Sequence, residues 1–231
     1  MSAGFNRKPK TEFFNIVYEK SLYLTILFDS PRQVDSITSH LMTLYHVALP
    51  PHPFRLVSVL VSLLYYLVSA YPSQSLFYER LHSLPTSFLF KQSPPYIWIS
   101  TLTSGLRSRN YFKLEELTRR STFTSLIYES PINAVHPSLL ADQALCAIIG
   151  KLRALLRETA WSVIRSAYRE LSCCPDRETT KDWLARSLVL HSTATAAGDM
   201  SLDDWLQQKI KDGHIRAKGN IDGIYIICKV R

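Results

Sequence analysis

Glycine and cysteine are both scarce in this 231-residue sequence, which has seven glycines and four cysteines. Loops that hold phosphates or dinucleotides need several glycines at fixed spacings, and no such pattern occurs. With so little glycine, most of the length should be regular helix joined by short connections. The cysteines contain no C-x-x-C pair, and Cys173 and Cys174 are adjacent, so we interpret all four as reduced core thiols in preference to zinc ligands.

Catalytic signatures are missing as well. The chain has no G-x-S-x-G nucleophile turn and no H-E-x-x-H metal motif. His40, His46 and His52 lie close in sequence, but no acidic residue or cysteine stands beside them at a ligand spacing, so we interpret them as surface or capping residues. We therefore expect no catalytic residues, no cofactor and no metal site.

An apolar signal segment is also lacking, because the basic stretch from Met1 to Lys10 contains no hydrophobic run. This predicts an intracellular protein. The most apolar segment, Phe54 to Tyr71, could be considered as a membrane span, but a span needs about 20 consecutive apolar residues. This run contains three serines and meets Pro72. We expect a buried central helix and no membrane span, with a membrane-associated protein as the less favoured alternative.

What the sequence does contain is hydrophobic and basic residues. Hydrophobic residues make up 46% of the chain, enough for a substantial core, and disorder is not expected. The formal net charge is +8, from 27 Lys and Arg against 19 Asp and Glu. Such a balance permits contact with nucleic acid or with an acidic partner.

The first two thirds of the chain read as consecutive helices. Ser30, Pro31 and Gln33 resemble a capping box before a helix that should end near Val47, and Asn110 can cap another. The expected helices are Glu12 to Asp29, Ser30 to Val47, Phe54 to Tyr71, Leu76 to Leu84, Ile97 to Arg107, one starting at Tyr111, and Ser138 to about Leu156. We interpret residues 1–157 as a helical-repeat, TPR-like stack, although no strict 34-residue repeat is visible.

The last third should contain three helices followed by a hairpin. Helices are expected over Glu158 to Leu171, after Thr179, and from a capping box at Ser201 and Asp204 to a left-handed Gly213. The hydrophobic period then changes from 3.6 to 2, which predicts strands at His214 to Lys218 and Ile224 to Val230 and no others. The core should hold one tryptophan from each helix: Trp161, Trp183 and Trp205. The fold class is therefore mainly α, with a winged helix and its small β-hairpin over residues 158–231.

Candidate nucleic-acid-binding residues are four basic side chains. Arg165 and Arg169 are four apart, on one expected helix face, and Arg216 and Lys218 lie on the hairpin. Such a set could neutralise phosphates of RNA or DNA, although an ordinary solvated face is the competing interpretation. The third helix should present Asp203, Asp204, Gln207, Gln208 and Lys211 outward, and its two carboxylates would repel phosphate. Sequence-specific reading is therefore not expected.

The candidate partner-binding residues are Tyr225 and Ile227. The strand Ile224 to Ile227 is apolar on both faces, so both faces should be covered. We assign Ile224 and Ile226 to the winged-helix core. Tyr225 and Ile227 would then remain for another protein.

A resemblance to a known family rests on this organisation and on two short motifs. A helical stack running into a terminal winged helix resembles PCI-type domains. The segment Leu106 to Phe112, LRSRNYF, is similar to the turn of the GANP family, which usually has glycine where this chain has Arg109. The segment Ala160 to Arg169, AWSVIRSAYR, is similar to that family's helix ending in alanine, tyrosine and a basic residue. Ser192 to Met200 looks like an insertion.

The resemblance implies a non-catalytic scaffold subunit in transcription-coupled mRNA processing and nuclear export. It implies binding to a small acidic subunit, with some nucleic-acid contact, in the nucleus, the cytoplasm being a second location. Two alternatives remain open. One is a subunit of another PCI complex, such as the proteasome lid, the signalosome or a translation initiation factor. The other is a stand-alone winged-helix protein that binds nucleic acid.

Overall fold

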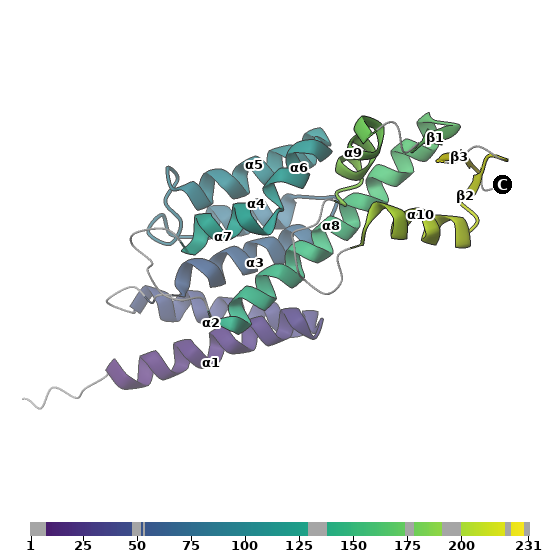
Figure 1. Ribbon diagram of the computed structural model, residues 1–231. Helices are drawn as coiled ribbons and strands as arrows, with labels where there is room; N and C mark the ends of the chain where they lie inside the picture. Colours follow the sequence, from purple (N-terminus) through teal and green to yellow (C-terminus); the bar gives the residue numbers. More distant parts are fainter. Residues whose placement is uncertain are drawn as a thin grey trace, which may run out of the picture. The chain divides into compact units, whose positions relative to one another are not determined.

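The computed structural model describes residues 8–47, 52, 54–128, 138–173, 178–190, 200–219 and 223–228. Within these ranges the chain is mainly helical, with ten α-helices, one 3-10 helix and a small antiparallel sheet (Figure 1). The chain divides into two compact units. The first comprises residues 1–97 and 124–151, and the second 98–123 and 152–231. The division into functional domains after residue 157 stays a prediction.

The first unit begins with four helices, α1 (Lys8–Leu27), α2 (Val34–Val47), α3 (Arg55–Ser69) and α4 (Ser75–Ser83), and α3 packs against the other three. These helices match the expected ones. The capping box at Ser30 is wrong, because the Ser30 side chain makes no cap hydrogen bond. Residues Pro31–Gln33 form a 3-10 turn instead, in which the Gln33 N–H donates to the backbone carbonyl of Ser30 at 3.4 Å.

The most apolar segment of the chain, Phe54 to Tyr71, forms the centre of the first unit, as predicted. Ten of the 15 residues of α3 are buried, among them Leu60 and Leu64, and even Ser58 and Ser62 are enclosed. Ser58 and Ser62 have partners inside the protein, since Ser58 contacts the Tyr23 hydroxyl at 2.7 Å and Ser62 donates to the Val59 carbonyl at 2.8 Å. In the described ranges, none of the helices combines the length and the apolar character that crossing a membrane requires.

Helices α5 (Pro94–Ser108), α6 (Tyr111–Leu117), α7 (Arg120–Tyr128) and α8 (Leu139–Ala167) follow. The cap of α6 is confirmed, because the Asn110 side chain accepts from the Lys113 N–H at 3.1 Å. The two helices expected over residues 138–171 are wrong. Residues 139–167 form one helix of 29 residues. Arg157 and Glu158 stand at the junction of the two expected helices, and both favour helix, so the helix continues through them. That helix ends before Leu171.

The sheet has three strands, β1 (Glu170–Ser172), β2 (Ile215–Ala217) and β3 (Ile224–Ile227), with β3 in the middle. The predicted hairpin of β2 and β3 is confirmed, but the expectation of no other strand is wrong. Glu170 pairs with Ile226 and Ser172 with Ile224. A three-residue strand is too short to show a period of two, and its buried Leu171 also falls at helical spacing from Ile164, so it was assigned to the helix.

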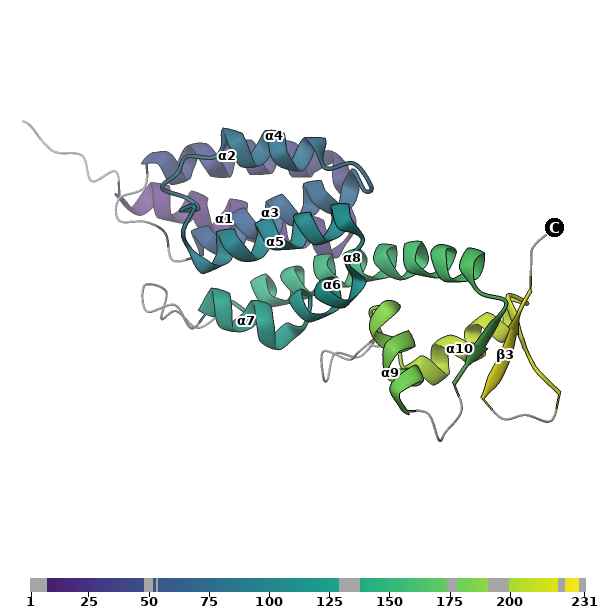
Figure 2. The same cartoon turned by 90° about the horizontal axis from the view of Figure 1, so that it is seen from above.

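Two further helices, α9 (Glu178–Ser187) and α10 (Leu202–Lys211), complete the second unit (Figure 2). Helix α10 leads into β2 (Figure 1). Trp161 and Trp205 are buried and meet edge to face at 5.1 Å, while Trp183 is partly buried against the same core. The capping box of Ser201 and Asp204 is confirmed, as is the left-handed Gly213, with φ of +71°. Residues 192–199 of the segment that looks like an insertion lie outside the described residues.

Candidate functional site

The two faces of the sheet follow from its register. Leu171 lies opposite Tyr225, and Ile215 lies opposite Ile227. Leu171, Ile215 and Ile227 are all buried in the tryptophan core, against which Tyr225 also packs. This row of side chains is therefore the inner face of the sheet, and the alternate residues Ile224 and Ile226 lie on the outer face.

The assignment of Tyr225 and Ile227 to a free partner surface is wrong. Ile227 is only 7% exposed and belongs to the core. Four consecutive apolar residues in β3 make both faces look alike, so the strand itself does not reveal which face is covered. The neighbouring strand decides it, because Ile215 is followed by the polar Arg216 and pairs with Ile227.

The outer face combines two partly buried isoleucines with charged neighbours. Glu170 lies opposite Ile226 on one side, and Arg216 lies opposite it on the other. Lys218 donates to both carboxylate oxygens of Glu170, at 2.8 and 2.9 Å, so this ion pair crosses the central strand. We define the outer sheet face as Glu170, Arg216, Lys218, Ile224 and Ile226. An apolar centre with a charged rim is the usual composition of a protein contact.

The four predicted phosphate-binding residues are not arranged as expected. Arg169 lies beyond the end of α8, so it does not share a helix face with Arg165, which is partly buried. The Arg169 backbone carbonyl accepts from the Ile227 N–H at 2.9 Å. Arg216 and Lys218 do share a face, but Glu170 accompanies them there. The positive charge on this face is therefore partly neutralised.

The outward-facing residues of α10 are the expected ones, but the burial of Lys209 was not predicted. The outward positions of this helix, as predicted, are all exposed: Asp203, Asp204, Gln207, Gln208 and Lys211. Lys209 is 7% exposed. Its Nζ lies about 6 Å from the rings of Trp161 (6.0 Å) and Trp205 (5.8 Å) and 3.4 Å from Glu158. The spacing of four between Trp205 and Lys209 was the available signal for this contact.

The turn between α5 and α6 has a left-handed residue at its centre. Arg109 has φ of +54°. The N–H of Asn110 donates to the Gly105 carbonyl at 3.0 Å, and the N–H of Arg109 donates to the Leu106 carbonyl at 3.3 Å, the bonds of a Schellman helix end. A Cβ on Gly105 would lie 3.1 Å from Cδ2 of Leu114, so glycine allows α5 and α6 to approach closely.

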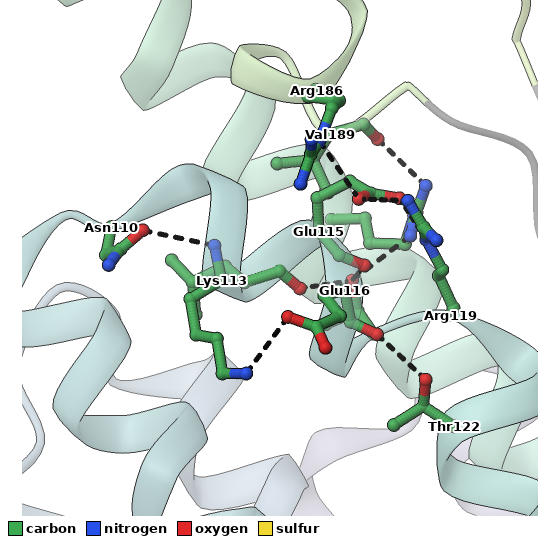
Figure 3. A network of polar contacts seen from close by, with 11 residues as sticks. Asn110, Lys113, Glu115, Glu116, Arg119, Thr122, Arg186 and Val189 are labelled. Atoms are coloured by element: carbon green, nitrogen blue, oxygen red, sulfur yellow. Dashed lines mark hydrogen bonds and ion pairs between the residues drawn. The ribbon is translucent and has the colours of Figure 1, made fainter.

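A buried carboxylate joins α6 to its neighbours (Figure 3). Glu115 is fully buried, and Arg119 donates to its two oxygens at 2.7 Å each. Arg186 of α9 approaches the same carboxylate at 3.9 Å, an ion-pair distance, and its guanidinium lies 4.6 Å from the centre of the Phe112 ring. The hydrogen bonds to Glu115 raise the pKa of Arg119. Arg119 therefore remains charged beside the buried carboxylate.

A second buried charge extends this network to α8. Arg153 is 5% exposed and donates to the Thr118 hydroxyl at 3.1 Å and to the Val189 carbonyl at 3.0 Å. Val189 ends α9 with φ of +54°, which is unusual for a β-branched residue. The contacts of Glu115 and Arg153 thus connect α6 to α8 and α9. In the sequence, the only sign of the Arg153 contacts was that this charged residue stands within the apolar pattern of α8.

The first unit contains a separate buried polar cluster. Glu19 is 3% exposed and accepts from the Tyr45 hydroxyl at 2.5 Å, and Nδ1 of His52 lies 2.7 Å from it. The assignment of His52 to the surface or to a cap is therefore wrong, whereas His40 and His46 are exposed. Burial, followed by the nearby Glu19 carboxylate, raises the pKa of Tyr45 well above its ordinary value.

Among the side chains that the structure describes, no group of three or more His, Cys, Asp or Glu residues could hold a metal ion. Comparison of the chain with models of known protein families gives no match. Comparison with curated proteins gives no match either.

Proposed function

We propose that the chain is a non-catalytic scaffold or adaptor subunit of a multiprotein complex, with a PCI-type winged helix at its C-terminal end. The observation that carries the proposal is the order of elements from α8 onward. A helix, a strand, two helices and two strands follow one another, and the last strand lies between the other two. A winged helix has this order and this strand arrangement. The helices preceding it would form the helical-repeat stack.

The turn after α5 supports the narrower resemblance to the GANP family. That family usually has glycine at the position of Arg109, and Arg109 has the left-handed backbone that glycine adopts most easily. Asn110 caps the following helix, and the buried Glu115 connects that helix to α9. These contacts give the Leu106 to Phe112 segment a structural role in the second unit. On this basis we place the protein in mRNA processing or nuclear export, in the nucleus, with a small acidic subunit as one partner.

The outer sheet face is the proposed partner surface, in place of Tyr225 and Ile227. Ile224 and Ile226 supply apolar area there, and Arg216 with the Glu170–Lys218 pair supplies a mixed-charge rim. A mixed rim favours a protein over a polyanion, because Glu170 repels phosphate while both kinds of charge can find partners on a protein. Phosphate contact through Arg169 and Arg216 would be a secondary activity.

The test is recovery of partners from cells that make this protein. The tagged chain, expressed at its natural level, should be recovered with a reproducible set of other subunits. Ile224→Ser combined with Ile226→Ser should remove them. Val163→Ser is the matched control, because Val163 is an exposed apolar residue of the same unit that lies on α8 and not in the sheet. Circular dichroism should show that both variants keep the helical content of the wild type.

The identity of the recovered subunits separates the alternatives. Proteasome-lid, signalosome or initiation-factor subunits would place the chain in another PCI complex. A monodisperse chain recovered alone, with tight binding to DNA or RNA, would overturn the scaffold proposal. Recovery that is unchanged in the double serine variant would exclude the outer sheet face as the contact.

A further inference from the structure

Over the first half of helix α1, polar side chains are buried and apolar side chains are exposed. The buried side of α1 includes Asn15, 2% exposed, and Glu19, 3% exposed, whereas Phe13 is 63% exposed. A helix that packs against a core by one side only normally has the opposite arrangement. The exposed large apolar residues of this segment are Phe13, Phe14, Ile16, Val17, Leu24 and Phe28, which we call the α1 stripe.

The α1 stripe faces away from the neighbouring helices. Residues 13, 17, 24 and 28 are separated by four, seven and four positions, which places them within one narrow sector of a helix. Phe28 continues this sector beyond the last helical residue, because its N–H donates to the Leu24 carbonyl at 2.9 Å. In Figure 1, α1 lies at an edge of the first unit, with α2 and α3 beside it.

The exposed area of the stripe is large for a surface without a partner. At about 200 Å² for an aromatic side chain, the three phenylalanines alone expose roughly 400 Å². The whole stripe exposes on the order of 600 Å², above the few hundred Å² typical of monomer surfaces. Covered on two chains, it would bury about 1,200 Å², the lower end of specific interfaces.

We propose that the α1 stripe is covered by the same stripe of a second copy, with the two α1 helices antiparallel. The spacing of four, seven and four reads the same from either end, with its centre between Lys20 and Ser21. In a two-fold antiparallel pair, residue i of one chain meets residue j of the other and j meets i, so this spacing brings apolar residues opposite apolar residues. Phe13 then faces Phe28 of the second chain, and Val17 faces Leu24 of the second chain.

Lys20, at the centre of the spacing of the stripe, gives the dimer a distinctive salt dependence. Lys20 is exposed and lies next to the two-fold axis, so the two Lys20 ammonium groups come close to each other. Their stems can lie along the apolar surface while the charges point toward water. Repulsion between them is screened by salt, so the dimer should strengthen as salt is added. A stripe covered by an acidic partner would show the opposite trend.

Two double variants test whether the two α1 stripes are in contact and whether the two helices are antiparallel. In Phe13→Glu with Phe28→Glu, each glutamate faces another glutamate across the interface, so the dimer should be lost. In Phe13→Glu with Phe28→Lys, each glutamate faces a lysine of the other chain, so the dimer should be retained. Within one chain these positions are about 22 Å apart, at 1.5 Å per residue, too far to pair with each other.

The measurement is molar mass by light scattering and sedimentation of the purified full chain, over the micromolar range. Phe90→Glu is the matched control, because Phe90 is 60% exposed and lies in the loop before α5 of the same unit. The wild type, the Phe90 variant and the Glu–Lys variant should have twice the mass of one chain. The Glu–Glu variant should have the mass of one chain, with unchanged circular dichroism.

Three outcomes would overturn the proposal. A wild-type chain that remains monomeric throughout the range would show that something other than a second copy covers the stripe. Equal dimerisation of the wild type and the Glu–Glu variant would place the interface elsewhere. Dissociation of the Glu–Lys variant together with the Glu–Glu variant would exclude the antiparallel pairing. The proposal does not depend on the proposed scaffold function.

Discussion

Three helices of the second unit end on a residue with a left-handed backbone: Arg109, Val189 and Gly213. Only Gly213 is of the type that adopts this conformation without strain. The other two are held by their surroundings, Arg109 by the turn that Asn110 closes and Val189 by Arg153, which binds its carbonyl. Specific contacts therefore offset the backbone strain at Arg109 and Val189. Glycine would relieve this strain at Arg109, which is exposed.

Replacing Arg109 by glycine should stabilise the second unit by about 1 kcal/mol, because glycine has no Cβ to oppose the left-handed backbone. Arg109→Ala is the control and should give no such gain, since it removes the same charge and keeps the Cβ. Urea unfolding followed by tryptophan fluorescence suits this measurement, because Trp98, Trp161, Trp183 and Trp205 all belong to the second unit. Equal stabilisation by both substitutions would show that charge, and not the backbone, is the cause.

Glu115 and Glu116 form a natural pair for measuring the buried network. Glu115→Gln should lower the free energy of unfolding by about 3 kcal/mol, because it leaves the positive charges of Arg119 and Arg186 without their buried anion. Glu116 is 53% exposed and pairs with the Lys113 side chain at 2.9 Å, so Glu116→Gln should cost no more than about 0.5 kcal/mol. Tryptophan fluorescence in urea again measures both. Similar small losses would mean that solvent screens Glu115 as well.

Tyr45 should make the first unit sensitive to alkaline pH. Its pKa is raised by burial, so the protonated hydroxyl contributes stability that is fully present below about pH 10, the pKa of an unfolded tyrosine. This contribution is lost as the pH rises further toward the folded-state pKa. Tyr45→Phe lacks it, so the stability difference between wild type and variant should shrink above about pH 10. Urea unfolding by circular dichroism at increasing pH tests this, and a constant difference would contradict it.

Helices were predictable from the sequence where capping residues and prolines mark their ends. Asn110 and Ser201 identified two helix starts correctly, and the change of hydrophobic period located the hairpin. What the sequence could not show depends on partners distant along the chain. β1 exists only because Glu170 and Ser172 pair with β3, and α8 continues because no residue stops it.

The strand Ile224–Ile227 was predictable in position, but not which of its faces is buried. The pattern correctly identified residues 224–227 as a strand that is apolar on both faces, and which face is inside depends on the pairing of Ile227 with Ile215. Arg153 and Glu115 were missed because a buried charge looks like a surface charge until its partner is known. Lys209 was missed for the same reason, and His52 because its contact with Glu19 comes from a distant part of the chain.

The central helix α3 gives a prediction about the stability of the first unit. Leu64 is fully buried, so Leu64→Asp would enclose an unpaired carboxylate, which costs several kcal/mol and approaches the stability of a small domain. The far-UV circular dichroism signal and the yield of soluble protein should both fall. Leu76→Asp, at a position that is 43% exposed on α4, should change neither. A well-folded Leu64→Asp protein would show that the core around α3 admits water.

The net charge of +8 is spread over the chain, and the structure shows how little of it is available on the outer sheet face. Lys218 is paired with Glu170, and Arg165 is partly buried on α8. Of the four candidate phosphate-binding residues, Arg169 and Arg216 are the exposed ones. Nucleic-acid binding through the four candidate residues should therefore depend on these two and be weak and independent of sequence.

Changing Arg169 and Arg216 together to glutamate should weaken binding to unrelated RNA and DNA sequences by similar factors, because phosphates carry no sequence information. Each lost phosphate contact should also reduce the slope of log affinity against log salt by about 1. Gln207→Ala with Gln208→Ala, on the exposed side of α10, is the control and should change neither quantity. Fluorescence anisotropy over a range of salt concentrations measures both. If the glutamine variant alone lost binding, and only for some sequences, α10 would be reading bases and the phosphate hypothesis would be wrong.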